Sequence, residues 1–327
     1  MAEEWVPDIL GDGFEQLTLP LGVDGQSGPL DATLVRSIPN HLAAWAKPLA
    51  DVDVLYIHGW SDYFFQTELA HFHTSRGARF YALDLRRYGR SIRPGQTRGY
   101  VGSLDDYDLE IELALEAMGH GVDADPKRKL VLLGHSTGGL TLTLWAARHS
   151  GRASALVLNS PWLELQIGAI GRQVVAPLVG MRARVDPRGN NPVVDLGYYT
   201  RAQKEVGSLP VPHYREDWRP EFGFPTKPGW LEAVVHGHAR IARGIDVGCP
   251  ALVMLSAHSA SPFTWTDSAT NADSVLIVDD IAKAATRIGD LVTIARVDGA
   301  IHDVFLSRAQ PRQKAYKVLD HWLVGLR

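Results

Sequence analysis

Short apolar runs alternate with longer amphipathic stretches along most of the chain. The runs at 52–57, 130–133 and 155–158 are largely apolar, which is typical of strands buried on both faces of a parallel sheet. Further strands are predicted at 14–19, 32–38, 80–83, 251–255 and 292–297, the first two forming a hairpin. Helices are predicted at 63–76, 104–118, 140–149, 279–288 and 304–323. This alternation predicts an α/β fold with a mostly parallel central sheet flanked by helices.

The predicted helix at 104–118 has clear signals at both ends. Ser103 can cap its N-terminus, and acidic residues occupy its first turns. Gly119 can end it, because glycine adopts the left-handed conformation that often follows a helix.

The rhythm changes between residues 161 and 243. Residues 163–179 are apolar with glycine and proline interruptions, and a loop-rich region with many aromatic residues follows. Prolines are frequent in the second part of this segment, and we expect them to prevent long regular elements there: Pro187, Pro192, Pro210, Pro212, Pro220, Pro225 and Pro228. We therefore predict one core formed by residues 1–160 and 244–327, interrupted by an inserted subdomain at 161–243.

Composition and charge exclude several classes of protein. The 33 basic and 37 acidic side chains give a net charge of −4, so no basic surface for nucleic acid is expected. No apolar run approaches the length of a membrane span, and the acidic start lacks a signal-peptide pattern, so a cytoplasmic protein without an integral membrane segment is expected. Cys249 is the only cysteine, which excludes an internal disulfide. We expect it to be a small packed residue.

The strongest chemical signal is Gly-His-Ser-Thr-Gly at 134–138. It follows a predicted buried strand and precedes a predicted helix. In this context the G-x-S-x-G pattern is typical of a sharp turn that presents a nucleophilic serine above the sheet. Ser136 is therefore the candidate nucleophile.

An activated serine needs a base and donors for the oxyanion. His302 lies between the last predicted strand and the terminal helix, where a base would overhang the turn. The oxyanion would be held by the backbone amides of Thr137, directly after the nucleophile, and of Trp60, in the turn after strand 52–57. His58, Gly59 and His135 flank these positions and are expected to line the substrate site.

With these motifs the chain resembles an α/β-hydrolase. More narrowly, it is similar to the cap-bearing hydrolases related to monoacylglycerol lipase and to serine aminopeptidases. The resemblance rests on four motifs in the family's order: His-Gly-Trp at 58–60, Asp-Leu-Arg-Arg-Tyr-Gly-Arg-Ser at 84–91, residues 134–139, and Asp-Gly-Ala-Ile-His-Asp at 298–303. It implies that residues 161–243 form a cap over the active site. The motif at 84–91 is expected to be structural and to support the turn at Ser136.

The triad acid is the point where the chain departs from this family. The family usually has an aspartate a few residues after the strand that is 251–255 here, but residues 256–261 contain no carboxylate. Asp273 lies in an Asp-Ser-Val sequence that matches the later part of the family pattern. We interpret 256–271 as a lengthened loop that returns Asp273 to the acid position. Asp267 and Asp279 are the alternatives.

The predicted activity is hydrolysis of a carboxylic ester, for example a small acyl or aryl ester, a monoacylglycerol or a lysophospholipid, through an acyl-enzyme on Ser136. No cofactor or metal is expected, since the glycines at 134, 138 and 139 do not match a dinucleotide fingerprint or a P-loop. One alternative is a proline-type aminopeptidase, which would need a carboxylate from the insert to bind the substrate ammonium. Acids that could serve lie there, among them Glu164, Glu205, Glu216, Asp217, Glu221 and Glu232. The other alternative is a non-catalytic binding protein with the same fold. The oligomeric state is not predicted.

Overall fold

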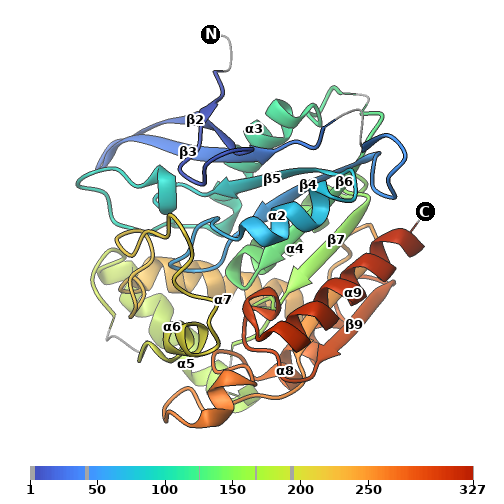
Figure 1. Cartoon of the computed structure of the whole chain (residues 1–327). Helices are drawn as coiled ribbons and strands as arrows, with labels where there is room; N and C mark the ends of the chain where they lie inside the picture. Colours follow the sequence, from blue (N-terminus) through green and yellow to red (C-terminus); the bar gives the residue numbers. More distant parts are fainter. Residues whose placement is uncertain (1–3, 41–43, 125, 166–167, 192–194, 327) are drawn as a thin grey trace.

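The computed structural model describes residues 4–40, 44–124, 126–165, 168–191 and 195–326. Within these ranges nine strands form one sheet in the order β1-β2-β3-β5-β4-β6-β7-β8-β9 (Figure 1). The strands are β1 (Val6–Pro7), β2 (Glu15–Asp24), β3 (Gly28–Ser37), β4 (Val52–Ile57), β5 (Arg79–Asp84), β6 (Lys129–His135), β7 (Ala155–Asn159), β8 (Ala251–Ser256) and β9 (Val292–Val297). Pairing is antiparallel from β1 to β5 and parallel from β5 to β9. The predicted α/β class, with its mostly parallel sheet and its N-terminal hairpin, is confirmed.

Helices cover both faces of the sheet. Outside the insert they are α2 (Thr67–Thr74), α3 (Asp108–Met118), α4 (Thr137–Arg148), α8 (Val278–Ala285) and α9 (Ala309–Gly325). Alternate residues of a strand point to opposite faces, so Leu55 and Leu132 pack with α3, α4 and α8, whereas Val54 and Val131 pack with α2 and α9. Because both faces of the sheet are covered, the side chains that point to either face are apolar. The central strands are therefore continuous apolar runs in the sequence.

The predicted helix at 104–118 begins as a 3₁₀ turn, Leu104–Tyr107, and continues as α3. The Ser103 hydroxyl accepts a hydrogen bond from the amide of Asp105, and the Asp106 carboxylate accepts one from the amide of Ser103. Gly119 follows the helix at φ +83°. Both predicted end signals are therefore confirmed, although the first turn is tighter than an α-helix.

The segment 161–243, called the insert below, lies between β7 and β8. It contains α5 (Gly168–Val185), α6 (Tyr198–Glu205) and α7 (Pro228–Ala242). In Figure 1 it runs from yellow-green to gold at the lower left, beside the orange segment that follows β8. The prediction that prolines prevent long elements in its second part was wrong. Pro228 is the first residue of the 15-residue helix α7. Proline is tolerated there because an amide hydrogen in the first turn has no acceptor within the helix, so its absence costs no hydrogen bond. None of the helices in the described part of the chain is long and apolar enough to cross a membrane.

Candidate active site

Ser136 stands at the sharp turn between β6 and α4. Its backbone has φ +51° and ψ −116°, a strained conformation for a residue with a side chain. The turn is held by the Ser136 amide, which donates to the carbonyl oxygen of Asn159 at 3.0 Å, and by the Ser136 carbonyl, which accepts from the amide of Trp162 at 3.0 Å. Ser136 is 8% exposed. This is the geometry that the G-x-S-x-G pattern predicts for a nucleophile.

Glycines let the turn approach its neighbours. A Cβ on Gly134 would lie 2.6 Å from the Cα of Gly139, and a Cβ on Gly138 would lie 2.3 Å from the carbonyl oxygen of His58. The first close approach folds the strand end onto the helix, and the second brings the helix onto the end of β4. Both contacts involve backbone, which cannot rotate away.

We expect Gly138→Ala to lower the free energy of unfolding by about 3 kcal/mol, because backbone must move to admit the methyl group. Urea denaturation measures the change. Gly25→Ala is the matched control, since no atom lies within 4 Å of its added Cβ and its φ is not positive. Equal denaturation midpoints for the two variants would show that the packing at Gly138 is not the constraint.

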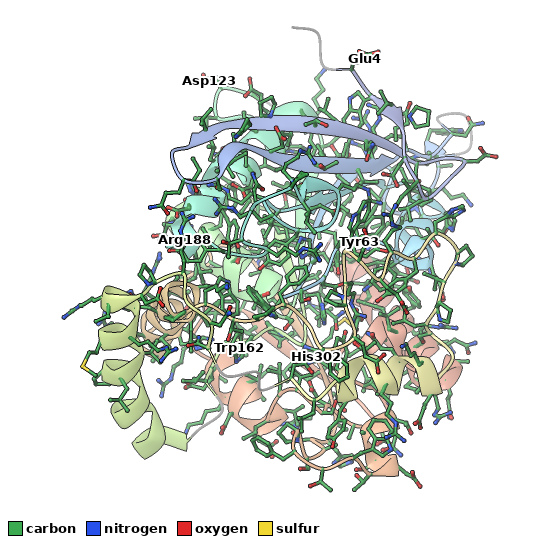
Figure 2. All side chains as sticks on the ribbon, turned by 90° about the vertical axis from the view of Figure 1, so that its left-hand side faces the viewer. Glu4, Tyr63, Asp123, Trp162, Arg188 and His302 are labelled. Carbon is green, nitrogen blue, oxygen red and sulfur yellow. The ribbon has the colours of Figure 1, made fainter. Side chains whose placement is uncertain are left out.

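His302 and Asp273 meet beside this turn. The ring Nδ1 of His302 lies 2.9 Å from Oδ2 of Asp273, and the two side chains are 2% and 0% exposed. Nδ1–H donates to the carboxylate, which leaves Nε2 as the basic nitrogen of the ring. Figure 2 labels His302 at nearly the same level as Trp162, which stands at the start of the insert.

The loop after β8 returns Asp273 to the end of that strand. The Asp273 amide donates to the carbonyl oxygen of His258 at 2.9 Å, and its carbonyl accepts from the amide of Ala260 at 2.7 Å. Its Oδ1 accepts two further amides, Val275 and Leu276, both at 2.8 Å. The carboxylate is therefore fixed on both oxygens, and the loop brings Asp273 into contact with His302.

The two alternative acids lie elsewhere. Asp267 is exposed in the 3₁₀ turn Asp267–Thr270. Asp279 pairs with Arg296 at 2.6 Å, and its side chain is 82% exposed. Of the three candidates, only Asp273 contacts His302.

Sequence reasoning missed a second buried carboxylate, Asp303. One of its oxygens accepts from the Asn159 side chain at 2.7 Å, and the other accepts from Gln66 at 2.6 Å. The backbone carbonyl oxygen of Asn159 also accepts a hydrogen bond from the amide of Ser136. These contacts tie the His302 loop to the turn at Ser136. The available signal was the position of Asp303 next to His302, but neither partner could be identified from the chain.

Residues 58–63 form a loop that packs against the turn at Ser136 and is called the oxyanion loop below. A Cβ on Gly59 would lie 3.1 Å from the Cβ of Ser136, so glycine allows this approach. Among the described residues, no hydrogen bond is formed by the amide of Trp60 or by that of Thr137. Both amides therefore lack a partner among the described residues, and their role as oxyanion donors stays a prediction.

His58 orients this loop instead of offering a group to a substrate. Its Nδ1 donates to the carbonyl oxygen of Gly59 at 2.8 Å, and its Nε2 accepts from the amide of Leu85 at 3.2 Å. Burial lowers the pKa of its imidazole, which favours the neutral ring that this pattern requires. The predicted substrate role of His58 has no free ring nitrogen to support it.

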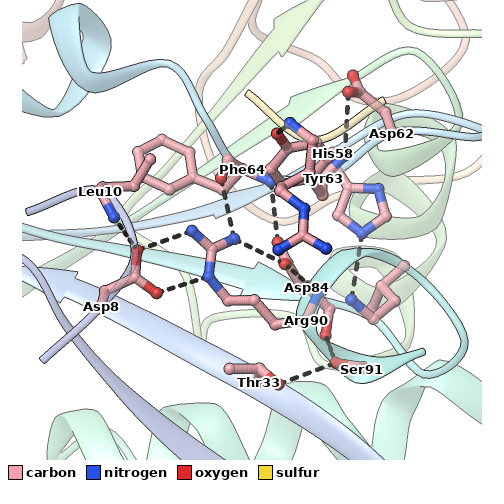
Figure 3. A network of polar contacts seen from close by, with 12 residues as sticks. Asp8, Leu10, Thr33, His58, Asp62, Tyr63, Phe64, Asp84, Arg90 and Ser91 are labelled. Carbon is pink, nitrogen blue, oxygen red and sulfur yellow. Dashed lines mark hydrogen bonds and ion pairs between the residues drawn. The ribbon is translucent and has the colours of Figure 1, made fainter. Parts of the chain in front are cut away.

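The motif at 84–91 supports the segment that continues the oxyanion loop (Figure 3). The Asp84 carboxylate accepts from the amide of Phe64 at 2.9 Å and from Arg90 Nη1 at 2.8 Å. Arg90 also donates to the carbonyl oxygen of Phe64 and, through Nε and Nη2, to both oxygens of Asp8. The pKa of Arg90 is raised, because these carboxylates outweigh the burial that would lower it. The motif is structural as predicted, but it supports the oxyanion loop rather than the turn at Ser136.

His135 lies among charged and aromatic groups. Its ring centroid is 5.1 Å from that of His302, and its Nδ1 is 3.7 Å from Oδ2 of Asp62, too long for a hydrogen bond. Burial alone would lower the pKa of His135, but the charges of Asp303 and Asp62 raise it. Tyr199, from α6 of the insert, packs edge-on against His302 at 5.1 Å. The insert therefore reaches the proposed base.

Most of the insert's aromatic residues pack it onto the core. Trp230 and Phe224 are buried in the same cluster as the sheet residues, and both contact the Trp60 ring, at 3.7 and 6.2 Å between centroids. Part of the apolar segment 163–179 lies outside the described residues (166–167). Phe222 is exposed.

Two other sequence expectations concern metals and cysteine chemistry. Within the part of the chain that the structure describes, no three His, Cys, Asp or Glu side chains converge as a metal site. Cys249 is half-buried, and burial raises the pKa of its thiol to about 11, so the reactive thiolate is disfavoured.

Comparison with known proteins identifies the family. The profile of the family described as serine aminopeptidase, S33 (Hydrolase_4) matches residues 50–257, more than half of the chain. The structure resembles a soluble variant of monoglyceride lipase from Saccharomyces cerevisiae, with a TM-score of 0.65 and 16% identity over 95% of this chain and 96% of that one. It also resembles the monoacylglycerol lipase of Paleococcus ferrophilus, with a TM-score of 0.57 and 18% identity over 84% and 95% of the two chains.

Curated relatives match over shorter segments. A (lyso)-N-acylphosphatidylethanolamine lipase of Bos taurus is 31% identical over 143 residues, 43% of this chain and 39% of that protein. The Homo sapiens protein of the same name is 34% identical over 82 residues, which cover 25% of this chain and 22% of the human protein. The matches thus span less than half the length of these relatives. Together with the family profile and the sheet topology, they lead to one conclusion: the chain is an α/β-hydrolase of the serine aminopeptidase S33 family.

Proposed function

We propose that this protein is a serine hydrolase that cleaves carboxylic esters of lipids through an acyl-enzyme on Ser136. The observation that carries the proposal is the buried contact between His302 Nδ1 and Asp273 Oδ2, 2.9 Å long, beside a serine at φ +51°. In a catalytic triad the imidazole takes the serine proton, and the carboxylate orients the imidazole and stabilises its charged form.

In the proposed reaction, Nε2 of His302 takes the proton of the Ser136 hydroxyl as its oxygen attacks the ester carbonyl. The amides of Trp60 and Thr137 bind the oxyanion of the tetrahedral intermediate. The imidazolium, stabilised by Asp273, then gives its proton to the leaving alcohol as the C–O bond breaks. Water deprotonated by the same nitrogen attacks the acyl-enzyme, and the acid leaves with Ser136 restored.

The insert and the relatives support the proposed substrate class. We propose that the insert is a cap over the active site, with residues 1–160 and 244–327 as the core. Support comes from Trp162 and Tyr199, which the insert contributes next to Ser136 and His302. Aromatic side chains beside the site suit a substrate with an acyl chain. The names of the relatives, which include monoglyceride lipase and (lyso)-N-acylphosphatidylethanolamine lipase, favour monoacylglycerols or lysophospholipids as test substrates.

The buried carboxylates around the site favour an ester over an N-terminal peptide. An aminopeptidase needs a free carboxylate for the substrate ammonium. Asp62 is paired with Arg219, Asp273 with His302, and Asp303 with two side-chain amides. Three of the insert's acids are occupied in surface ion pairs: Glu205 with Arg201, Glu221 with Lys204 and Asp217 with Arg215.

The test is covalent labelling with a fluorophosphonate, followed by mass spectrometry of the labelled peptide. We expect one adduct per chain, on Ser136, and hydrolysis of p-nitrophenyl esters and monoacylglycerols with a dependence on acyl length. Absence of both labelling and turnover would contradict the proposal and favour a non-catalytic binding protein. Cleavage of proline β-naphthylamide without ester turnover would favour the aminopeptidase.

A further inference from the structure

The insert contacts four consecutive residues of the oxyanion loop. The ring of Trp60 packs on Trp230, and the Ser61 hydroxyl accepts from the amide of Phe224 at 3.0 Å. Asp62 pairs with Arg219, and the Tyr63 hydroxyl accepts from the amide of Arg215 at 2.7 Å. The contacted core residues are consecutive, so the insert holds the loop from Trp60 to Tyr63.

The Arg219–Asp62 ion pair is the most buried of these contacts. Arg219 Nε lies 2.9 Å from Oδ1 of Asp62, and the side chains are 3% and 4% exposed. Nη2 of Arg219 donates to Gln203 at 2.7 Å and Nη1 to the Tyr214 hydroxyl at 3.1 Å, so all three nitrogens are used. Burial alone would raise the pKa of Asp62, but the guanidinium lowers it, and the carboxylate stays charged. Removing either partner would leave a buried charge without its ion-pair partner.

The pair acts on backbone that needs support. Asp62 is two residues after Trp60, whose amide is a proposed oxyanion donor. Ser61, between them, has φ +50°, a conformation that persists only where the surroundings impose it. Donors in an oxyanion hole must lie at hydrogen-bond distance from the oxygen that becomes negatively charged. A displacement of about 1 Å can lower the rate by about 100-fold.

We propose that Arg219 is a positioning residue, which holds the oxyanion loop in its catalytic conformation through Asp62 although it belongs to the insert and touches no reacting atom. This inference rests on the proposed function and adds a role for the insert in the chemical step. An insert that only covered the substrate would affect substrate binding. An insert that holds the loop affects stabilisation of the transition state.

A matched arginine lies four residues earlier. Arg215 Nε is also 2.9 Å from an aspartate oxygen, that of Asp217, but these side chains are 48% and 55% exposed. Its contact with Tyr63 uses the backbone amide, which substitution of the side chain keeps. Arg215→Gln therefore removes an arginine, and an ion pair of the same length, from the same segment, while the backbone amide that donates to Tyr63 stays in place.

The experiment compares Arg219→Met with Arg215→Gln, with rates expressed per site that a fluorophosphonate labels at completion. We expect Arg219→Met to lower kcat by about 10- to 100-fold with KM changed by less than about threefold. Arg215→Gln should stay within about twofold of the wild type. A trifluoromethyl ketone, which adds the serine oxygen and forms an oxyanion, should bind Arg219→Met more weakly by the same factor as kcat/KM. The analogue in which a CH2 group replaces the ketone carbonyl forms no oxyanion and should bind both variants alike.

A purely structural role predicts a different result: fewer labelled sites, with an unchanged kcat per site and unchanged affinity for the trifluoromethyl ketone. That result would overturn the inference, as would an equal fall in Arg215→Gln. If Arg219→Met does not fold, the neutral double variant Asp62→Asn/Arg219→Gln leaves no buried charge and is judged by the same criteria. Failure of the proposed function is separate, because the wild-type protein itself would then not be labelled.

Discussion

Replacing Ser136 with alanine is expected to remove almost all ester hydrolysis, with a fall in kcat of about 10⁴- to 10⁶-fold. Alanine lacks the oxygen that forms the acyl-enzyme, so only binding and the oxyanion donors remain. Hydrolysis of a p-nitrophenyl ester, corrected for the spontaneous rate, measures the loss. The melting temperature should change little, because alanine adopts the strained turn about as well as serine.

Ser160 provides a matched control for this variant. It is also buried, has φ +45°, and carries a hydroxyl without a hydrogen-bond partner among the described residues. Ser160→Ala should keep activity within a few-fold of the wild type and keep fluorophosphonate labelling. Activity that survives in Ser136→Ala and disappears in Ser160→Ala would move the nucleophile to the end of β7.

The second large effect is expected for Asp273→Asn, with kcat lowered by about 10³- to 10⁴-fold and KM nearly unchanged. Asparagine keeps the size of the side chain and can accept the amides of Val275 and Leu276 on its carbonyl oxygen. Its NH₂ group then faces Nδ1 of His302 and must donate to it. The ring proton moves to Nε2, which can no longer accept the proton of Ser136. Steady-state kinetics at saturating ester measures the effect.

The two aspartates considered as alternatives are the controls. Asp267→Asn and Asp279→Asn change exposed side chains and should leave kcat within about twofold. A full loss in either of them, with Asp273→Asn active, would refute the assignment of the acid.

The sequence could predict the parts of the site that lie in one stretch of chain. The turn at Ser136 combines a buried strand, a glycine pattern and a helix within a few residues, and each of these constraints is local. His302 could be placed because it follows the last strand. Choosing Asp273 as the acid required the loop 256–271 to fold back to the end of the strand. The Asp-Ser-Val residue types suggested this, whereas the number of residues after the strand did not.

The contacts between distant segments could not be predicted. Asp62 and Arg219 are ordinary charged residues in loop-rich sequence, and only the folded insert brings them together. The strands of the hairpin, β2 and β3, extend past the predicted 14–19 and 32–38, because their outer part leaves the core and loses its apolar pattern: Val23 there is 77% exposed. The hydrogen bonds between the two strands involve backbone groups only, so the strands stay paired beyond the apolar pattern that the sequence shows.

Backbone hydrogen bonds join Asp273 to His258 and Ala260. They close residues 261–272 into a separate loop, called the branch. Insertions or deletions within that branch can change the count of residues between β8 and the proposed acid without moving the carboxylate. Evolution can therefore adjust what the branch touches, such as Tyr198 and Arg201 of α6, both of which meet Trp265. In related chains the acid should be sought by its partners in space, and an alignment that scores a fixed offset from the strand will overlook it.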